Sequence, residues 1–145
     1  MKIGKLLDYN NSIKTIIDNA KDVNALVKFR LLSMCKQIEP VEEIVEKVRI
    51  EKLKQYGSTT ADGDIGIFKP VKEDYENDAD YNDAIKKYEK DVSSFQKDMN
   101  ELLSSEADIE IKKFKPSDIF DAGLPADYLL VIYDLIEEWF GGTYE

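Results

Sequence analysis

The chain has 145 residues, of which 43% are apolar and 34% are charged, and its formal net charge is −10. This length and apolar content predict a single folded domain, residues 1–145, rather than a disordered chain. The excess of carboxylates argues against direct binding to duplex DNA or RNA, which requires a surplus of Lys and Arg to displace counterions.

Two helices are predicted in the first part of the chain. Residues 6–19 carry apolar side chains at three- and four-residue steps, as an amphipathic helix requires. The clearest segment is 23–56, for which Asp22 or Asn24 can provide the N-cap. Its apolar residues recur in alternating steps of four and three, the heptad pattern of a coiled-coil seam. They are Val27, Leu31, Met34, Ile38, Val41, Val45 and Val48. Pro40 interrupts this seam, and we expect a kink or break there because proline lacks the backbone donor and clashes with the preceding turn.

A second long helix is predicted over residues 78–104. Its seam has the same steps and consists of Tyr81, Ile85, Tyr88, Val92, Phe95, Met99 and Leu102. The connecting residues 57–73 contain Asp62-Gly63, a strong turn signal that predicts a short β-hairpin. Because the two seams match in length, we expect them to pair antiparallel. The predicted fold class is therefore mainly α (α+β), a long antiparallel helical hairpin with a small β element.

The last third of the chain predicts shorter elements. Apolar and polar side chains alternate over residues 107–114, which predicts one half-buried strand. The 57–73 hairpin is the nearest candidate partner for this strand. A short helical turn begins at residues 115–118, and a final helix is predicted over 126–140. This helix is apolar nearly all round, so it should be buried in the fold or in a partner. Its excess apolar surface leads us to expect a homo-oligomer.

The sequence offers little for catalysis. It contains no histidine, the commonest general base and metal ligand. Its single cysteine, Cys35, cannot form an internal disulfide, which fits a reducing compartment, and no histidine is present to activate it. No apolar run approaches the roughly 18 residues needed to span a bilayer. We therefore expect a cytosolic protein that is not an enzyme, has no catalytic or metal-binding residues and uses no cofactor.

A calcium loop is the one metal site that the spacing suggests. Asp78, Asp80, Asn82 and Glu89 match the EF-hand ligand positions. Asp83, however, stands where the sharp turn of that loop needs glycine. The same residues also carry the seam of the 78–104 helix, and we favour the helix.

Two sets of residues are candidates for binding. One set is either ordinary surface charge or the lining of a basic groove between protomers that holds a small phosphorylated ligand, and it consists of Lys28, Arg30, Lys36 and Arg49. Near the end of the chain, Trp139, Phe140 and Tyr144 are either core residues or anchors for a partner.

The order of these features resembles a family of small, uncharacterised bacteriophage proteins. In that family a basic and apolar helix leads into a long acidic helix with a Lys-x-Tyr-Gly stop. An Asp-Gly loop, a second long helix ending in Glu-Leu-Leu and an acidic-apolar strand follow. The corresponding pieces here are VKFR at 27–30, VRIEKLKQYG at 48–57, Asp62-Gly63, MNELL at 99–103, ADIEI at 107–111, PSDI at 116–119 and LPA at 124–126. Pro40 and the acidic stretch 73–83 depart from the family pattern.

The resemblance implies a bacteriophage protein in the host cytoplasm or the virion, and it supplies no catalytic residues. We expect a non-enzymatic protein that acts by protein–protein interaction, as a virion or assembly component. Its partners would be its own copies and phage or host proteins, with no membrane. The alternative is an inhibitor of host defence that sequesters a nucleotide signal or caps a host protein as an acidic mimic. A replication or transcription accessory is a further alternative.

Overall fold

The computed structural model describes residues 1–20, 22–119 and 124–137. It is mainly α-helical, with long helices arranged as a hairpin and one two-stranded antiparallel sheet, so the predicted fold class is confirmed. The chain divides into two compact units, residues 1–42 with 106–145 and residues 43–105. Helix α2 (Ala25–Tyr56) contributes residues to both units. That the chain folds as one domain stays a prediction.

The first two helices begin close to where their sequence signals place them. Helix α1 spans Ile3–Asn19, three residues longer at its start than expected. Asn24 is the N-cap of α2, because its side-chain oxygen accepts a 2.9 Å hydrogen bond from the backbone N–H of Val27. The cap satisfies one of the amide donors that a helix leaves free in its first turn.

A break at Pro40 is not seen, because α2 continues through this residue as one helix, and the kink that we expected as the other possibility stays a prediction. Proline removes the hydrogen bond that a residue 40 amide would donate to the carbonyl of Lys36. Pro40 lies on the exposed side of the helix, where water can hydrate that carbonyl. The loss is therefore small enough for the buried side of α2 to keep the helix intact.

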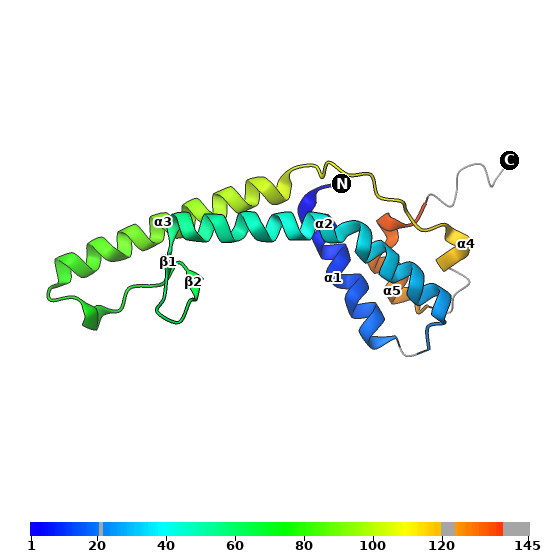
Figure 1. The fold of residues 1–145 in the computed structure, drawn as a ribbon, viewed down its shortest axis with the longest axis horizontal. Helices are drawn as coiled ribbons and strands as arrows, with labels where there is room; N and C mark the ends of the chain where they lie inside the picture. The colour runs from blue at the N-terminus through cyan, green and yellow to red at the C-terminus, as the bar shows by residue number, and fades with distance from the viewer. Residues whose placement is uncertain (21, 120–123, 138–145) are drawn as a thin grey trace. The chain divides into compact units, whose positions relative to one another are not determined.

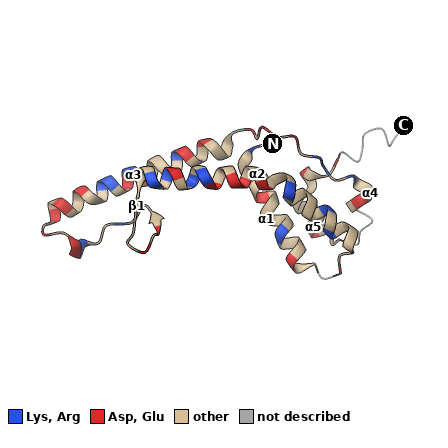
Figure 2. Cartoon of the chain, in the orientation of Figure 1, with Lys and Arg blue, Asp and Glu red and all other residues tan. Residues whose placement is uncertain are grey.

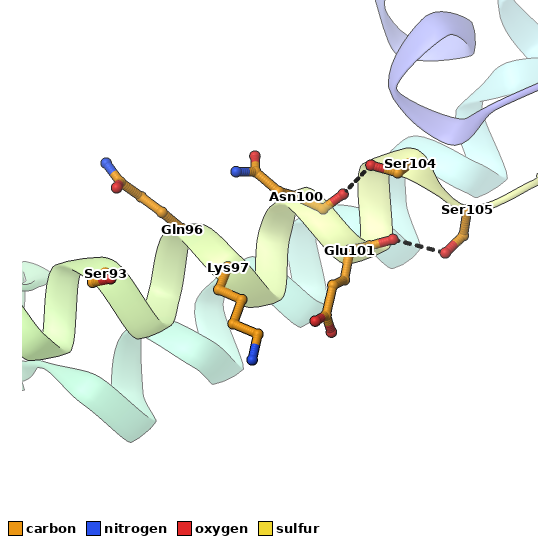
Figure 3. Close-up of a pocket in the computed structure, with 7 residues that line it drawn as sticks. All are labelled: Ser93, Gln96, Lys97, Asn100, Glu101, Ser104 and Ser105. Atoms are coloured by element: carbon orange, nitrogen blue, oxygen red, sulfur yellow. Dashed lines mark hydrogen bonds between the residues drawn. The ribbon is translucent and has the colours of Figure 1, made fainter.

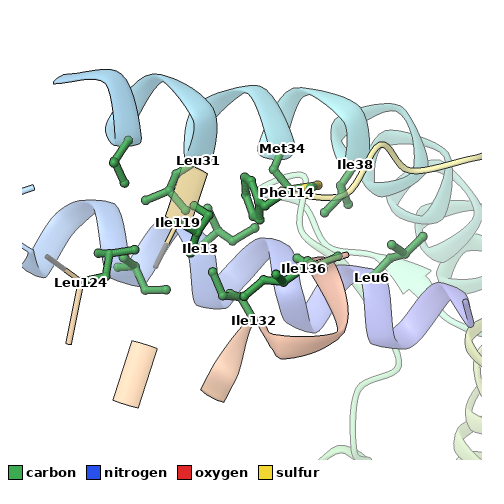
Figure 4. Packing of buried hydrophobic residues seen from close by; sticks show 13 residues of the cluster. Leu6, Ile13, Leu31, Met34, Ile38, Phe114, Ile119, Leu124, Ile132 and Ile136 are labelled. Carbon is green, nitrogen blue, oxygen red and sulfur yellow. The ribbon is translucent and has the colours of Figure 1, made fainter. Parts of the chain in front are cut away.

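The first unit is built around a core that α1 and the beginning of α2 share with the C-terminal segments. In Figure 4, Leu31, Met34 and Ile38 point from α2 toward Ile13 and Phe114. The complete cluster is Leu6, Ile13, Ile16, Val27, Leu31, Met34, Ile38, Phe114, Ile119, Leu124, Ile132, Leu135 and Ile136. The first four seam residues of α2 thus pack within this unit.

This packing corrects the expectation that the two long seams pair with each other throughout. Apolar residues of α1 and of the C-terminal segments occupy the first half of the α2 seam, so it is not available to α3 (Asp78–Ser104). Only the second half of α2 belongs to the same unit as α3. Sequence periodicity identifies which side chains are buried, but it does not say which helix covers them.

The predicted strand over 107–114 is also wrong. Within the described parts of the chain its one β contact is a parallel bridge from Phe114 to Ile136, in which the Phe114 N–H donates to Leu135 and the Glu137 N–H donates to Phe114, both at 2.8 Å. The backbone of Lys112 is bound by a side chain of α2. Gln37 accepts a hydrogen bond from the Lys112 N–H at 2.7 Å and donates one to the Lys112 carbonyl at 3.2 Å. The Gln37 side chain therefore takes the backbone hydrogen bonds of Lys112 that a neighbouring strand would otherwise have made.

The predicted C-terminal helix is shorter than expected. Helix α5 spans Ala126–Val131, and a 3-10 turn, η3, follows at Tyr133–Leu135. Ile136 is extended because it bridges Phe114, and this contact ends the helical region. Residues 138–140 lie outside the described residues. The short helix α4 (Pro116–Ile119) begins within the predicted turn at 115–118.

The second unit contains the helical hairpin. Helix α3 has the bounds predicted from its seam, and Asn77 caps it by accepting a 2.9 Å hydrogen bond from the Asp80 N–H. The Asp98 carboxylate of α3 accepts from the Tyr56 hydroxyl at 2.6 Å and pairs with the Lys52 ammonium at 3.3 Å. The end of α2 therefore lies beside the C-terminal half of α3, as Figure 1 shows.

The connection between these helices carries the small β-hairpin that the Asp-Gly turn predicts. Strands β1 (Ser58–Thr59) and β2 (Ile65–Gly66) pair antiparallel, and Gly63 has the positive φ, 89°, that favours glycine. Gly57 lies so close to the hairpin that an added Cβ would stand 2.2 Å from the carbonyl oxygen of Gly66. The pairing follows the prediction, although each strand is only two residues long. A 3-10 turn, η1 (Lys72–Asp74), leads from it toward α3.

Candidate functional site

The four basic residues predicted to form a groove are not brought together within one unit. Lys28, Arg30 and Lys36 belong to the first unit, whereas Arg49 belongs to the second. Arg30 has a structural role, since its guanidinium donates to the Asp118 carbonyl at 3.2 Å and lies 3.4 Å from the Asp118 carboxylate. A basic groove between protomers, which a single chain does not test, stays a prediction.

Two of these cations are also held by neighbouring carboxylates on the same helix. The Lys36 ammonium lies 3.0 Å from Glu39, and the Arg49 guanidinium donates twice to Glu46, at 2.8 and 2.5 Å. The bidentate Arg49 pair holds the pKa of the Glu46 carboxyl below its usual value. A phosphate would have to displace these carboxylates before it could bind either cation. Lys28 is exposed on α2.

Cys35 lies at the edge of the first unit's core. Burial raises the pKa of its thiol, and the nearby Lys14 ammonium opposes this rise only in part. A raised pKa disfavours the thiolate, which is the reactive form of cysteine. Partial burial therefore makes Cys35 a poor nucleophile.

The backbone does not form the calcium-binding loop that the residue spacing suggests. Residues 78–89 are helical throughout as part of α3, so they do not adopt the loop that would turn Asp78, Asp80 and Asn82 toward one ion. Within the described parts of the chain, no group of three Cys, Asp and Glu side chains gathers closely enough to hold a metal. Nor is any helix in these parts long and apolar enough to cross a membrane.

A shallow polar groove of about 780 Å³ follows the outer face of α3. Figure 3 shows its lining, which consists of Ser93, Gln96, Lys97, Asn100, Glu101, Ser104 and Ser105. The Ser104 and Ser105 hydroxyls donate to the backbone carbonyls of Asn100 and Glu101, at 2.5 and 2.8 Å. Because these hydroxyls donate to backbone carbonyls and not to the Glu101 carboxylate in the same lining, they are not activated nucleophiles.

A smaller and more enclosed pocket, of about 210 Å³, lies at the end of α2 in the second unit. We call it the aromatic pocket, because four of its residues are Tyr56, Phe68, Tyr75 and Tyr88. The rest of the lining is Gly57, Ser58, Ile67, Pro70, Ala84, Lys87 and Asp91. It brings together the end of α2, the loop that follows the β-hairpin and the first half of α3.

The walls of the aromatic pocket are held by specific contacts. The hydrogen bond from Tyr56 to Asp98 raises the pKa of the tyrosine hydroxyl and lowers that of the carboxyl. The ring of Tyr75 meets that of Tyr81 edge to face, with centroids 5.9 Å apart. The Lys87 ammonium lies 2.6 Å from the Asp91 carboxylate, so each of these charges in the lining has a partner.

A second candidate surface lies on the exposed side of α2 in the first unit. Leu26, Phe29 and Leu32 are 55%, 66% and 49% exposed, and they recur every three residues. We call these three residues the outer stripe. The seam residues Val27 and Leu31, next to them in sequence, are buried in the core, so the stripe is presented by a well-anchored helix.

Sequence reasoning missed both the aromatic pocket and the outer stripe. The stripe had a signal in Leu26, Phe29 and Leu32, whose three-residue spacing lies outside the heptad seam. The pocket had little signal, because its residues come from three separate segments. The predicted anchors Trp139, Phe140 and Tyr144 lie outside the described residues. Comparisons with protein-family models, curated proteins and solved structures found no match for this chain.

Proposed function

We propose that this chain acts by binding another protein and is not an enzyme. The observation that supports this proposal most strongly is the outer stripe. Three large apolar side chains on one rigid helix are more than the isolated exposed residue that any protein surface carries. Apolar and aromatic anchors of this kind contribute most of the binding energy in protein interfaces.

The resemblance to small bacteriophage proteins gives the proposal its biological setting. In that setting the chain is a virion or assembly component that binds its own copies or other phage proteins. Inhibition of host defence is the second candidate. Its acidic-mimic form is favoured by the segment 73–83, in which six exposed carboxylates precede or begin α3. Its nucleotide-sequestering form has less support, because Arg30, Lys36 and Arg49 already pair with carboxylates.

Co-purification with matched surface variants tests the proposal. Phe29→Ser removes the most exposed side chain of the stripe, and Ile44→Ser removes another exposed apolar side chain from the same helix but outside the stripe. We expect Phe29→Ser to lose a partner that the wild type and Ile44→Ser retain, with all three proteins showing the same far-UV circular dichroism. Equal retention by all three proteins would contradict the role of the outer stripe. A retained phage protein or second copy would indicate assembly, and a host protein would indicate the second candidate.

A further inference from the structure

The aromatic pocket has the size and chemistry to receive one side chain. Its volume of about 210 Å³ falls below the roughly 300–1,000 Å³ of typical small-molecule sites. Seven of its eleven lining residues are aromatic or aliphatic, and polar groups, among them the tyrosine hydroxyls, Lys87 and Asp91, make up the rest of a mixed lining. A pocket of this kind suits an aliphatic or aromatic side chain that is delivered by a longer segment.

The pocket is formed before any partner arrives. Tyr56 is fixed by Asp98, and Tyr75 is fixed by its edge-to-face contact with Tyr81. Gly57 allows the β-hairpin to approach the end of α2 at a distance that no side chain would permit. Because these contacts already order the walls, binding of a ligand does not carry the entropic cost of ordering them.

The segment that borders the pocket is strongly acidic. Tyr75 lies in the lining, and the exposed carboxylates of Glu73, Asp74 and Glu76 stand on either side of it in the sequence. Figure 2 shows acidic residues along η1 and the start of α3. Among the described residues, these three carboxylates have no Lys or Arg partner. Their charge is therefore available to a ligand outside the chain.

We propose that the aromatic pocket binds a lysine- and arginine-rich segment of a partner protein, which inserts one apolar or aromatic side chain between the rings. This inference rests on the proposed protein-binding function and names the partner chemistry for a second surface. The apolar side chain supplies affinity through burial, whereas the basic residues on either side of it pair with the acidic loop and accelerate association. The same loop repels nucleic acid and anionic lipid, which leaves a basic polypeptide as the fitting ligand.

Three labelled peptides test the inference by fluorescence anisotropy. The first alternates Lys and Ala around a central Phe, the second has Ala in place of that Phe, and the third has Glu in place of every Lys. We expect the first peptide to bind saturably and about tenfold more tightly than the second, and the third not to bind. No saturable binding of the first peptide at millimolar concentration, or equal binding of all three, would overturn the inference.

Two variants locate the binding. Phe68→Ala opens the pocket wall at a side chain that is 49% exposed, and we expect it to weaken the first peptide about tenfold without affecting the second. Ile44→Ala is its matched control, since Ile44 is exposed in the same unit but outside the pocket, and it should bind the peptides as the wild type does. If Phe68→Ala disturbs the β-hairpin, the variant is replaced by an NMR experiment that follows the amide chemical shifts of the wild type as peptide is added. We then expect the first peptide to shift Tyr56, Phe68 and Tyr88, and shifts confined to other residues would contradict the pocket.

The charge contribution has its own matched pair. Glu73→Gln with Glu76→Gln removes two charges beside the pocket, whereas Glu43→Gln with Glu51→Gln removes two exposed charges elsewhere in the same unit. We expect only the first pair to weaken binding, by about threefold at low salt and less at high salt. Equal effects of the two pairs would mean attraction by net charge alone and would overturn the inference. Failure here, with partner loss still seen for Phe29→Ser, would leave the proposed function standing.

Discussion

The Tyr56 hydroxyl donates a 2.6 Å hydrogen bond to the Asp98 carboxylate and so ties the end of α2 to α3. Asp98 also pairs with the Lys52 ammonium, which lies 6.0 Å from the centre of the Tyr56 ring. The three side chains form one linked group beside the aromatic pocket. Because the two contacts of Asp98 depend on its charge, the stability of the helical hairpin should depend on pH.

Replacing Tyr56 with Phe should lower the melting temperature only in a defined pH window. The pKa of Asp98 is lowered in the folded state, so its contribution is present above the ordinary value of 3.8 and is lost as the pH falls through the lowered pKa. The pKa of Tyr56 is raised, so its contribution is present below 10.0 and is lost as the pH rises through the raised pKa. We expect the difference between wild type and Tyr56→Phe to be largest from about pH 5 to 9. A difference that does not change with pH would contradict this coupling, and Tyr133→Phe is the exposed control.

Two adjacent leucines test which face of α2 is buried. Leu31 is fully buried in the first unit's core, whereas Leu32 belongs to the outer stripe. We expect Leu31→Ala to cost about 3 kcal/mol of unfolding free energy, and Leu32→Ala to change it by less than about 0.5 kcal/mol. Urea denaturation followed by circular dichroism measures both. Similar losses for the two variants would mean that the outer stripe is covered by the chain itself.

The contrast between these leucines shows what the sequence predicts and what it leaves open. The heptad spacing identifies Leu31 as a buried residue, and the bounds of α3 follow from its seam. The spacing does not identify the partner of the α2 seam, because α1, α3 and the C-terminal segments all offer apolar faces. The helix predicted through residue 140 ends early because the Phe114–Ile136 bridge favours an extended backbone. Contacts between segments far apart in the sequence decide these cases, and local patterns do not contain them.

Asn10 is a buried polar residue at a core position of α1, and it should cost stability. It is 1% exposed, its side-chain nitrogen donates to Glu42, and its side-chain oxygen has no hydrogen-bond partner among the described residues. We expect Asn10→Leu to raise the unfolding free energy by about 1 kcal/mol, because the unpaired oxygen is removed. The Glu42 carboxylate would still pair with the Lys14 ammonium and remain hydrated. Asn11→Leu, on the exposed face, is the control for helix propensity. A loss of stability in Asn10→Leu would show that the contact with Glu42 outweighs the unpaired oxygen.

Gly57 should be essential for the β-hairpin. Alanine there would place its Cβ 2.2 Å from the Gly66 carbonyl oxygen, so the pairing of β1 with β2 has to open. We expect Gly57→Ala to cost on the order of 3 kcal/mol and to remove the protection of the Thr60 amide from hydrogen exchange. Gly63→Ala meets no neighbouring atom and should cost only about 1 kcal/mol, through its positive φ. Retained Thr60 protection in Gly57→Ala would contradict the close approach.

The most direct test of the protein-binding account is photo-cross-linking from the outer stripe in cells. A photoreactive amino acid is placed at position 29 and, in the control, at the exposed Asp8 of α1 in the same unit. We predict that position 29 forms one dominant cross-linked product, identified by mass spectrometry, that position 8 does not form. Diffuse or absent cross-linking at position 29, equal to that at position 8, would contradict the account.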